Sequence, residues 1–232
     1  PPDGGSEKAP VVYQAAAPGK VILSGGQRIT GWKPATLNGK SVWAAQINEV
    51  KEGKWYFRQL FVNGRRAARP RLPKEGYHTF AGLPTTRPET TWGQGQDQAM
   101  FKPGALQNWN NLIDVEVVAL SLWIESHLPV AAIDTTANLV QFAKKSVFRL
   151  TNTHAPGDFS RYYVENVMEA LDTPGEWYLS RTSGTLYYYP RSDESPEDTE
   201  IIAPRLPHLL AIAGKHDGSQ PVSDIHVKGL TF

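Results

Sequence analysis

The sequence has no cysteine, no long apolar run and no excess of charge of one sign. Without cysteine there are no disulfides, no thiolate metal sites and no cysteine nucleophile. No apolar run approaches the roughly 18 residues of a membrane-spanning helix, so we expect no membrane span. The net charge of +1 gives no electrostatic reason to expect a nucleic-acid partner or an anionic membrane surface.

Motifs for metals and cofactors are also missing. The six histidines are scattered, and no two of them have the spacing of zinc ligands. They are His78, His127, His154, His208, His216 and His226. The sequence has no Gly-x-Ser-x-Gly elbow, no phosphate-binding loop and no dinucleotide fingerprint. We therefore expect neither a metal nor another cofactor.

Glycine, proline and β-forming residues are plentiful. The 232 residues include 20 glycines and 18 prolines, and valine, isoleucine, tyrosine, tryptophan and threonine are common. This composition favours many short strands joined by turns. The length suits one large all-β domain or two small ones.

Short apolar runs near both ends have the pattern of a β-solenoid. Residues 11–15 and 21–24 predict two strands separated by a Pro-Gly turn. Further along, residues 201–203, 209–212 and 225–227 are apolar runs separated by proline, glycine and aspartate. The spacing from the first to the last of these is close to one turn of a parallel β-helix.

The final residues alternate apolar and polar side chains. Ile225, Val227, Leu230 and Phe232 are expected to point inward on one rung of such a solenoid. A rung cannot bury its apolar face alone and needs a neighbour on each side. We therefore expect the chain to be a piece of a longer protein, in which any signal peptide lies upstream.

The middle of the chain, residues 50–198, is richer in aromatics and long loops. The strand-like run 55–62 is followed by Asn-Gly, a strong hairpin signal. Residues 130–142 and 177–189 predict two more hairpins. Residues 164–171 place apolar side chains at i, i+3, i+4 and i+7, which predicts a short amphipathic helix. We expect an inserted β domain between two parts of a solenoid.

Several segments together resemble a known family. They are Pro10–Gly26, Ile29–Trp32, Gln59–Ala67, Tyr162–Asn166, Leu171–Leu179 with Gly184–Tyr188, and Ile225–Phe232. The specific motifs within them are Leu-Phe-Val-Asn-Gly at 60–64 and Glu-Trp-Tyr-Leu at 176–179. The chain resembles bacterial right-handed parallel β-helix proteins related to glycoside hydrolase family 141, including the insertion domain of that group.

The resemblance implies an all-β fold with two parts. A partial right-handed parallel β-helix of the pectin lyase-like type is interrupted by an inserted antiparallel β-sandwich-like domain with one short helix. The expected boundaries are 1–49 for the start of the β-helix, 50–198 for the insertion and 199–232 for the resumed, truncated β-helix.

The resemblance also implies an activity. It points to an extracellular or periplasmic bacterial enzyme that degrades plant-type polysaccharide, such as fucosides or xylans, with its catalytic carboxylates on later β-helix turns. We therefore assign no catalytic residue within this chain. Ser180 stands where the family usually has an acidic residue, so we carry over no catalytic role for that carboxylate; a hairpin-capping role is one that serine can fill.

Two tryptophans in a polar loop are the candidates for sugar contact. Trp92 and Trp109 lie among glutamine and asparagine residues, and flat aromatic faces beside amide groups suit sugar rings. We expect Trp92, Trp109 and Asn110 to contact an oligosaccharide or polysaccharide. The tryptophans on predicted strands are expected in the core, namely Trp55, Trp123 and Trp177.

A run of carboxylates surrounds the predicted helix. Two carboxylates roughly 5–9 Å apart would suit glycoside hydrolysis. Glu165 and Glu169, however, are four residues apart on the predicted helix, and a structural role is favoured. We expect Glu176 to be buried, with Arg58 or Arg181 as its bidentate partner.

Two classes of function stay open. The first is the N-terminal portion of an exported glycoside hydrolase, with a polysaccharide lyase as its near neighbour. The second is a non-catalytic carbohydrate-binding or architectural module of a surface β-helix protein. Four arginines form either a solvated face or a site for an acidic sugar; these are Arg65, Arg66, Arg69 and Arg71. The sequence does not predict an oligomeric state.

Overall fold

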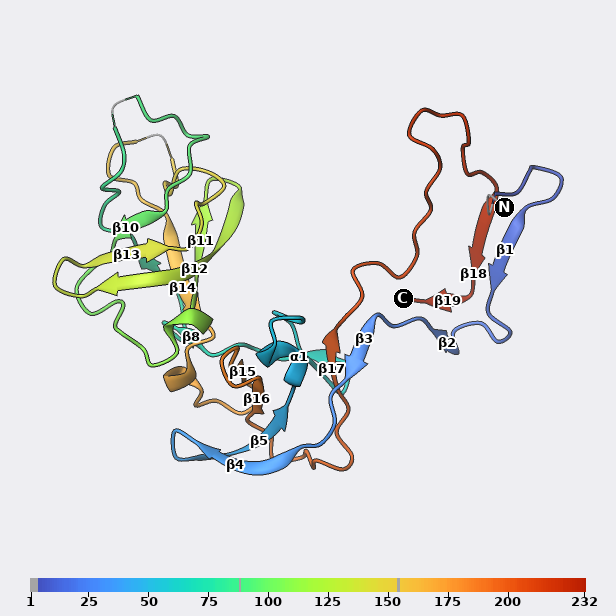
Figure 1. Cartoon of the computed structure of the whole chain (residues 1–232), viewed down its shortest axis with the longest axis horizontal. Coiled ribbons are helices and arrows are strands. Elements are labelled where there is room, and N and C mark those ends of the chain that lie inside the picture. The colour runs from blue at the N-terminus through green and yellow to red at the C-terminus, as the bar shows by residue number, and fades with distance from the viewer. Residues whose placement is uncertain (1–3, 88, 154) are drawn as a thin grey trace. The chain divides into compact units, whose positions relative to one another are not determined.

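The computed structural model describes residues 4–87, 89–153 and 155–232, and its chain divides into two compact units (Figure 1). Unit 1 comprises Pro1–Arg28 and Ile202–Phe232, and unit 2 comprises Ile29–Ile201. His154 lies outside the described residues. Within the described part of the chain, no helix is long and apolar enough to cross a membrane. The boundaries at 49/50 and 198/199 stay a prediction.

The larger sheet of unit 2 has seven strands, all joined by antiparallel pairings. The order is β10-β13-β12-β11-β14-β8, and β9 also pairs with β14. Their bounds are β8 (Arg71–Leu72), β9 (His78–Thr79), β10 (Gln98–Met100), β11 (Glu116–Ser121), β12 (Ile124–Asp134), β13 (Leu139–Phe142) and β14 (Arg161–Glu165). The 3-10 turn η1 (Leu112–Asp114) leads into β11.

The core of unit 2 lies against this sheet. Val117, Leu128 and Val164, from three adjacent strands, are fully buried. Phe80 stacks on Tyr162 with ring centroids 4.2 Å apart. Strand β12 alternates buried and partly exposed side chains along its first half, as expected for a strand with one face on a core. Its other face is therefore available to line a site.

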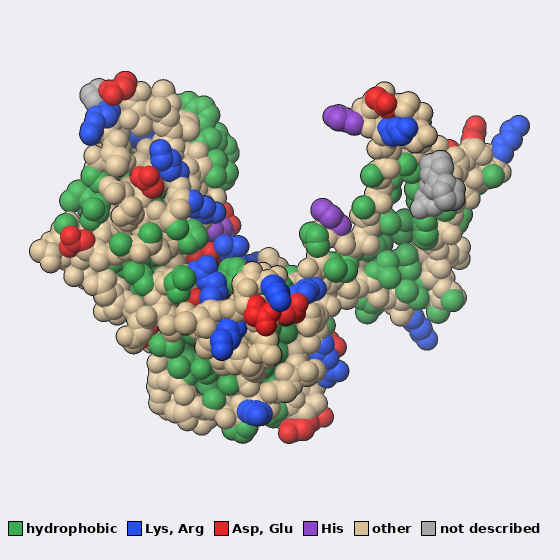
Figure 2. Space-filling model, viewed as in Figure 1, with side chains coloured by type: hydrophobic (Ala, Val, Ile, Leu, Met, Phe, Trp, Pro, Cys, Tyr) green, Lys and Arg blue, Asp and Glu red, His purple; other side chains and the backbone are tan. Residues whose placement is uncertain are grey.

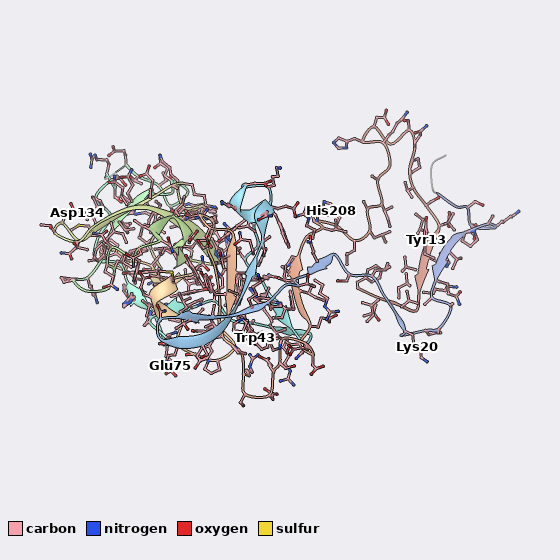
Figure 3. The ribbon with its side chains drawn as sticks, turned by 60° about the horizontal axis from the view of Figure 1, so that its bottom comes forward. Tyr13, Lys20, Trp43, Glu75, Asp134 and His208 are labelled. Atoms are coloured by element: carbon pink, nitrogen blue, oxygen red, sulfur yellow. The ribbon has the colours of Figure 1, made fainter. Side chains whose placement is uncertain are left out.

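A second sheet in unit 2 has four strands. Its order is β15-β16-β5-β4, again antiparallel. The bounds are β4 (Lys33–Leu37), β5 (Lys40–Gln46), β15 (Trp177–Leu179) and β16 (Thr185–Tyr188). Trp43 on β5 (Figure 3) is buried and contacts the rings of Trp32 and Tyr188. The hairpin predicted over residues 177–189 is confirmed.

Two further predicted hairpins are also confirmed. Strands β6 (Phe61–Val62) and β7 (Arg65–Arg66) pair around Asn63 and Gly64, whose φ values are +48° and +73°. Only a few residue types tolerate positive φ at both central positions, which is why Asn-Gly marks such turns. Strands β12 and β13 form the hairpin predicted over residues 130–142. The rest of the predicted strand 55–62 is not a strand; before β6 the chain contains the short helix α1 (Asn48–Lys51) and irregular backbone.

The predicted helix over residues 164–171 is wrong. Val164 belongs to β14, and Asn166 then adopts a positive φ of +59°. A 3-10 turn, η2 (Met168–Ala170), follows. Val164, Val167 and Leu171 are nonetheless fully buried, because a strand end and a tight turn place them in the core as a helix would. Periodicity alone does not separate these solutions.

The predicted parallel β-helix is also wrong. The described strands are mostly antiparallel. Two short pairs are parallel, namely β1 (Val11–Gln14) with β18 (Ile225–Lys228) and β2 (Val21–Ile22) with β19 (Leu230–Thr231). In unit 1, β3 (Gly26–Arg28) pairs antiparallel with residues 202–204 of β17 (Ile201–Pro204), whose first residue belongs to unit 2. Alternating apolar residues predict a strand, but they do not predict the direction of its partner.

Two further expectations that depended on the parallel β-helix are also wrong. Residues 209–212 are described and form no strand, and Ile212 is 57% exposed. Phe232 and Val227, expected to point inward, are 58% and 39% exposed.

Candidate functional site

A cleft of about 610 Å³ opens on unit 2 where β7, β8, β12 and β14 approach one another. It is rich in cationic side chains. Its lining comprises Arg58, Gln59, Arg66, Ala67, Ala68, Arg69, Arg71, Glu125, His127, Tyr163 and Glu165. Strand alternation explains why these side chains of β14 and β12 line the cleft. Tyr163 and Glu165 share one face of β14, and Glu125 and His127 share one face of β12. Three of the four arginines singled out in the sequence line this cleft. The fourth, Arg65, lies with Arg191 and Glu194 in another depression.

A buried carboxylate holds two of these arginines in place. Glu116 on β11 is 1% exposed. Arg58 Nε and Nη2 donate to its carboxylate at 2.7–3.0 Å, and Arg69 Nη1 donates to Oε2 at 2.7 Å. Burial alone raises the pKa of Glu116, but the hydrogen bonds and charges of Arg58 and Arg69 outweigh it and lower the pKa to about 2. Glu116 is therefore an anion at neutral pH, and it positions the two arginines.

Arg69 ties this pair to the wall of the cleft. It is 7% exposed, and its Nη1 also donates to Glu165 Oε2 at 3.2 Å. Its Nη2 donates to the Tyr56 hydroxyl at 3.2 Å. The guanidiniums of Arg58 and Arg181 lie over the Tyr56 ring, 5.2 and 5.1 Å from its centroid. The base of the cleft is thus a network of charges and rings that fixes side-chain positions.

Arg71, which also lines the cleft, contacts aromatic rings and backbone carbonyls among the described residues. Its guanidinium lies 4.0 Å from the Tyr163 ring centroid and 5.6 Å from that of Tyr77. Its Nε donates to Pro73 O at 3.1 Å, and its Nη2 donates to Gly76 O at 2.6 Å. These neutral partners orient Arg71 but leave its charge uncompensated by them.

A second cleft of about 310 Å³ continues from the first. The two share Arg58, Glu125 and His127, and the second adds Lys144 and Lys145. His127 Nε2 lies 3.1 Å from Glu125 Oε1. Figure 2 shows Lys and Arg side chains gathered on this part of unit 2.

The carboxylate predicted to be buried has a different cation. Glu176 is 6% exposed, as expected, but Lys74 Nζ donates to it at 2.9 and 3.1 Å. The expectation of Arg58 or Arg181 as its partner is wrong. Arg58 binds Glu116, and Arg181 Nε donates to Asp114 Oδ1 at 3.2 Å. The two arginines expected beside Glu176 are therefore bound to other carboxylates, those of Glu116 and Asp114.

The predicted sugar-contacting residues lie in unlike surroundings. Trp92 is 45% exposed. Trp109 is 5% exposed and packs in the main core of unit 2, so little of its ring is available to a ligand. Asn110 is exposed, and its backbone N–H donates to Glu169 Oε1 at 2.9 Å. Sugar contact by these three residues stays a prediction.

Trp123 was expected in the core and is instead 72% exposed. Its ring lies 5.7 Å from that of Trp92 and 5.3 Å from that of Phe148, and Trp92 and Phe148 are 5.0 Å apart. We call Trp92, Trp123 and Phe148 the aromatic platform. A signal was present in the sequence: Leu122 and Trp123 are the only residues between two strand-like runs, so they form the turn of the hairpin. By contrast, Trp55 and Trp177 are buried, as expected.

The described residues contain no group of three or more histidine, aspartate or glutamate side chains that could hold a metal ion. The features described so far define an antiparallel β domain with a cationic cleft and an exposed aromatic platform.

Comparison with known proteins assigns the chain to a family. The model of the GH141 insertion domain matches residues 39–191, which is more than half of the chain. The chain therefore belongs to the GH141 insertion domain family, and this part of the resemblance is confirmed.

A solved structure described as "Glycoside hydrolase" is similar over 98% of this chain, with a TM-score of 0.75 and 26% sequence identity. The chain spans 39% of the length of that protein. A search of curated proteins found no match.

Proposed function

We propose that this chain is part of an exported bacterial glycoside hydrolase that acts on plant-type polysaccharide. The observation that carries the proposal is the GH141 insertion domain match over residues 39–191, together with the likeness of nearly the whole chain to a glycoside hydrolase structure. Because the chain spans 39% of that structure, the whole enzyme has ample room for a catalytic centre elsewhere.

We further propose that hydrolysis takes place outside these 232 residues. Glycoside hydrolysis needs one carboxyl group with a raised pKa as the acid and a second carboxylate, roughly 5–9.5 Å away, as base or nucleophile. The carboxylates at the cleft are poorly suited to this. Glu116 has a pKa of about 2, and Glu165 is engaged by Arg69. Glu125 is more than half exposed, with His127 Nε2 3.1 Å from its carboxylate. The cleft is suited to holding a substrate and not to cleaving it.

The test compares the full-length protein with the 232-residue chain. Both are incubated with a panel of plant polysaccharides that includes fucosylated polymers and xylans, and released reducing sugar is measured. We expect release by the full-length protein and none by the chain. Release by the chain that is lost in Glu165→Gln would refute the placement of catalysis elsewhere. A full-length protein inactive on the whole panel would refute the proposed hydrolase activity on plant-type polysaccharide.

Export is tested separately. Antibodies against the chain are applied to cell fractions of the source bacterium. We expect the protein in the periplasm or the medium, and a cytoplasmic location would overturn this part of the proposal.

A further inference from the structure

We propose that the outer face of β12 is a binding track for an anionic polysaccharide, such as one that contains uronic acids. The aromatic platform would stack a sugar ring at one end, and the two cationic clefts would hold carboxylates along the rest. This inference rests on the proposed function, since it specifies the class of carbohydrate that the insertion domain contacts.

The strand register connects the platform to the clefts. Trp123 directly precedes β12, and Glu125 and His127 follow at two-residue intervals. Ser126 and Leu128, between and beyond them, are buried, so Glu125 and His127 share the outer face of β12. Trp123, in the turn before them, is itself exposed. At a rise of about 3.3 Å per residue, the four steps from Trp123 to His127 span at most roughly 13 Å. This length is longer than one sugar ring.

A second segment makes the same connection. Phe148 belongs to the platform, and its neighbour Val147 lines the second cleft. The backbone N–H of Val147 donates to Ser126 Oγ at 3.2 Å, which binds this segment to β12. Figure 2 shows hydrophobic side chains gathered at the edge of unit 2, with Lys and Arg side chains below them.

The platform itself is unusual for a surface. Trp92 and Trp123 are 45% and 72% exposed, although burying such rings is normally favourable. Clustered exposed aromatics commonly mark binding sites. The electron-rich face of an indole attracts the weakly positive C–H groups on the face of a sugar ring. A sugar chain is therefore the occupant that fits both the rings and the family of this domain.

The charge of the clefts selects an anionic chain over a neutral one. Six cationic side chains line the two clefts, and the carboxylates at them are Glu125, Glu165 and the buried Glu116. The entire protein has a net charge of only +1, so cations are concentrated here. Arg58 and Arg69 are paired with the carboxylates of Glu116 and Glu165. Among the described residues this leaves Arg66, Arg71 and the two lysines for a ligand. Arginine binds carboxylates through paired hydrogen bonds.

The experiment measures binding, not hydrolysis, so its outcome is separate from that of the hydrolase proposal. The 232-residue chain is titrated calorimetrically with oligogalacturonate and, as a matched neutral ligand, with its methyl ester. EDTA is present to exclude bridging calcium ions. We expect the anionic ligand to bind at least about tenfold more tightly, with an affinity that falls as salt rises.

Two variants and two controls separate the parts of the track. Trp123→Ala, at an exposed turn, is expected to weaken binding about tenfold through lost stacking. The double variant Lys144→Gln/Lys145→Gln is expected to weaken binding about fivefold and to reduce its salt dependence. Exposed residues outside the clefts serve as controls: Lys33→Gln and Ile113→Ala should bind as the unaltered chain does.

Three results would overturn the proposal. The first is equal affinity for the acid and the methyl ester, and the second is unchanged affinity in Trp123→Ala. The third is tighter binding to single-stranded DNA of matched charge, which would reveal a general polyanion site. Circular dichroism of each variant verifies that the fold is kept.

Discussion

Replacing Glu116 by glutamine tests the network at the base of the cleft. The change keeps the shape of the side chain but removes the charge that Arg58 and Arg69 share. Arg69 is then left nearly buried, with Glu165 at 3.2 Å as its remaining anion. Breaking a buried ion pair by removing one partner costs about 3–5 kcal/mol.

The lowered pKa of Glu116 gives a second measure of how much this carboxylate stabilises the folded state. It falls from the usual 4.5 to about 2 in the folded protein. A change of that size corresponds to about 3 kcal/mol, at roughly 1.4 kcal/mol per pH unit. Arg58 has a side chain that is 44% exposed, so solvent screens part of its contribution. We therefore expect Glu116→Gln to lower the free energy of unfolding of unit 2 by about 2–3 kcal/mol at pH 7.

The sign of the pH dependence follows from the lowered pKa. The stabilisation by Glu116 is fully present above the unfolded-state pKa near 4.5 and is lost as the pH falls towards 2. Glu116→Gln should lack this acid-dependent loss. The unaltered chain and the variant should therefore converge in stability as the pH is lowered from 5 to about 2.5.

Urea unfolding followed by tryptophan fluorescence measures this quantity in the right part of the molecule. All seven tryptophans lie within residues 29–201, so the signal reports on unit 2. Glu125→Gln, which alters a 55% exposed carboxylate, is the control and should change stability by less than about 0.5 kcal/mol. A loss below about 1 kcal/mol at pH 7, or an unchanged acid dependence in Glu116→Gln, would refute the reasoning.

Two matched pairs of substitutions test the packing of unit 2 by the same urea measurement. A Cβ on Gly95 would collide with the carbonyl oxygen of Ser146, whereas one on Gly93 would meet open space. Gly95→Ala should therefore cost about 1–3 kcal/mol and Gly93→Ala almost nothing, and equal effects would contradict the close approach. The Tyr162 hydroxyl is buried with no partner among the described residues, whereas that of Tyr178 donates to a buried carboxylate oxygen at 2.7 Å. Tyr162→Phe should be neutral or stabilising and Tyr178→Phe should cost about 1.5–3 kcal/mol; the reverse order would show that the buried hydroxyls are assigned wrongly.

Local structure followed from local sequence where short-range chemistry decides it. Asn63 and Gly64 were expected to form a turn, because few other residues adopt positive φ at both positions. The hairpin that begins at Trp177 was expected from two apolar runs around a polar segment. The segments matched to a glycoside hydrolase family also identified the insertion domain.

Some of the fold was not determined by local pattern. The direction of strand pairing depends on which distant segment lies alongside, and alternating side chains fit either direction. Residues 164–171 satisfied the spacing of a helix, yet Asn166 at positive φ turns the chain between β14 and η2. Its side-chain amide donates to the carbonyl oxygens of Asp114 and Leu179, contacts that exist only in the folded chain.

The sequence by itself determined an all-β chain without cysteine chemistry, its hairpin turns and its relation to the GH141 insertion domain. Only the tertiary structure decided which charges and rings meet. Arg58 is 58 residues from Glu116 along the chain and donates to its carboxylate, and Trp123 joins Trp92 and Phe148 at the surface. The physical reason is that ion pairs and ring contacts form between side chains that are near in space, and folding brings together residues whose separation along the chain carries no such information.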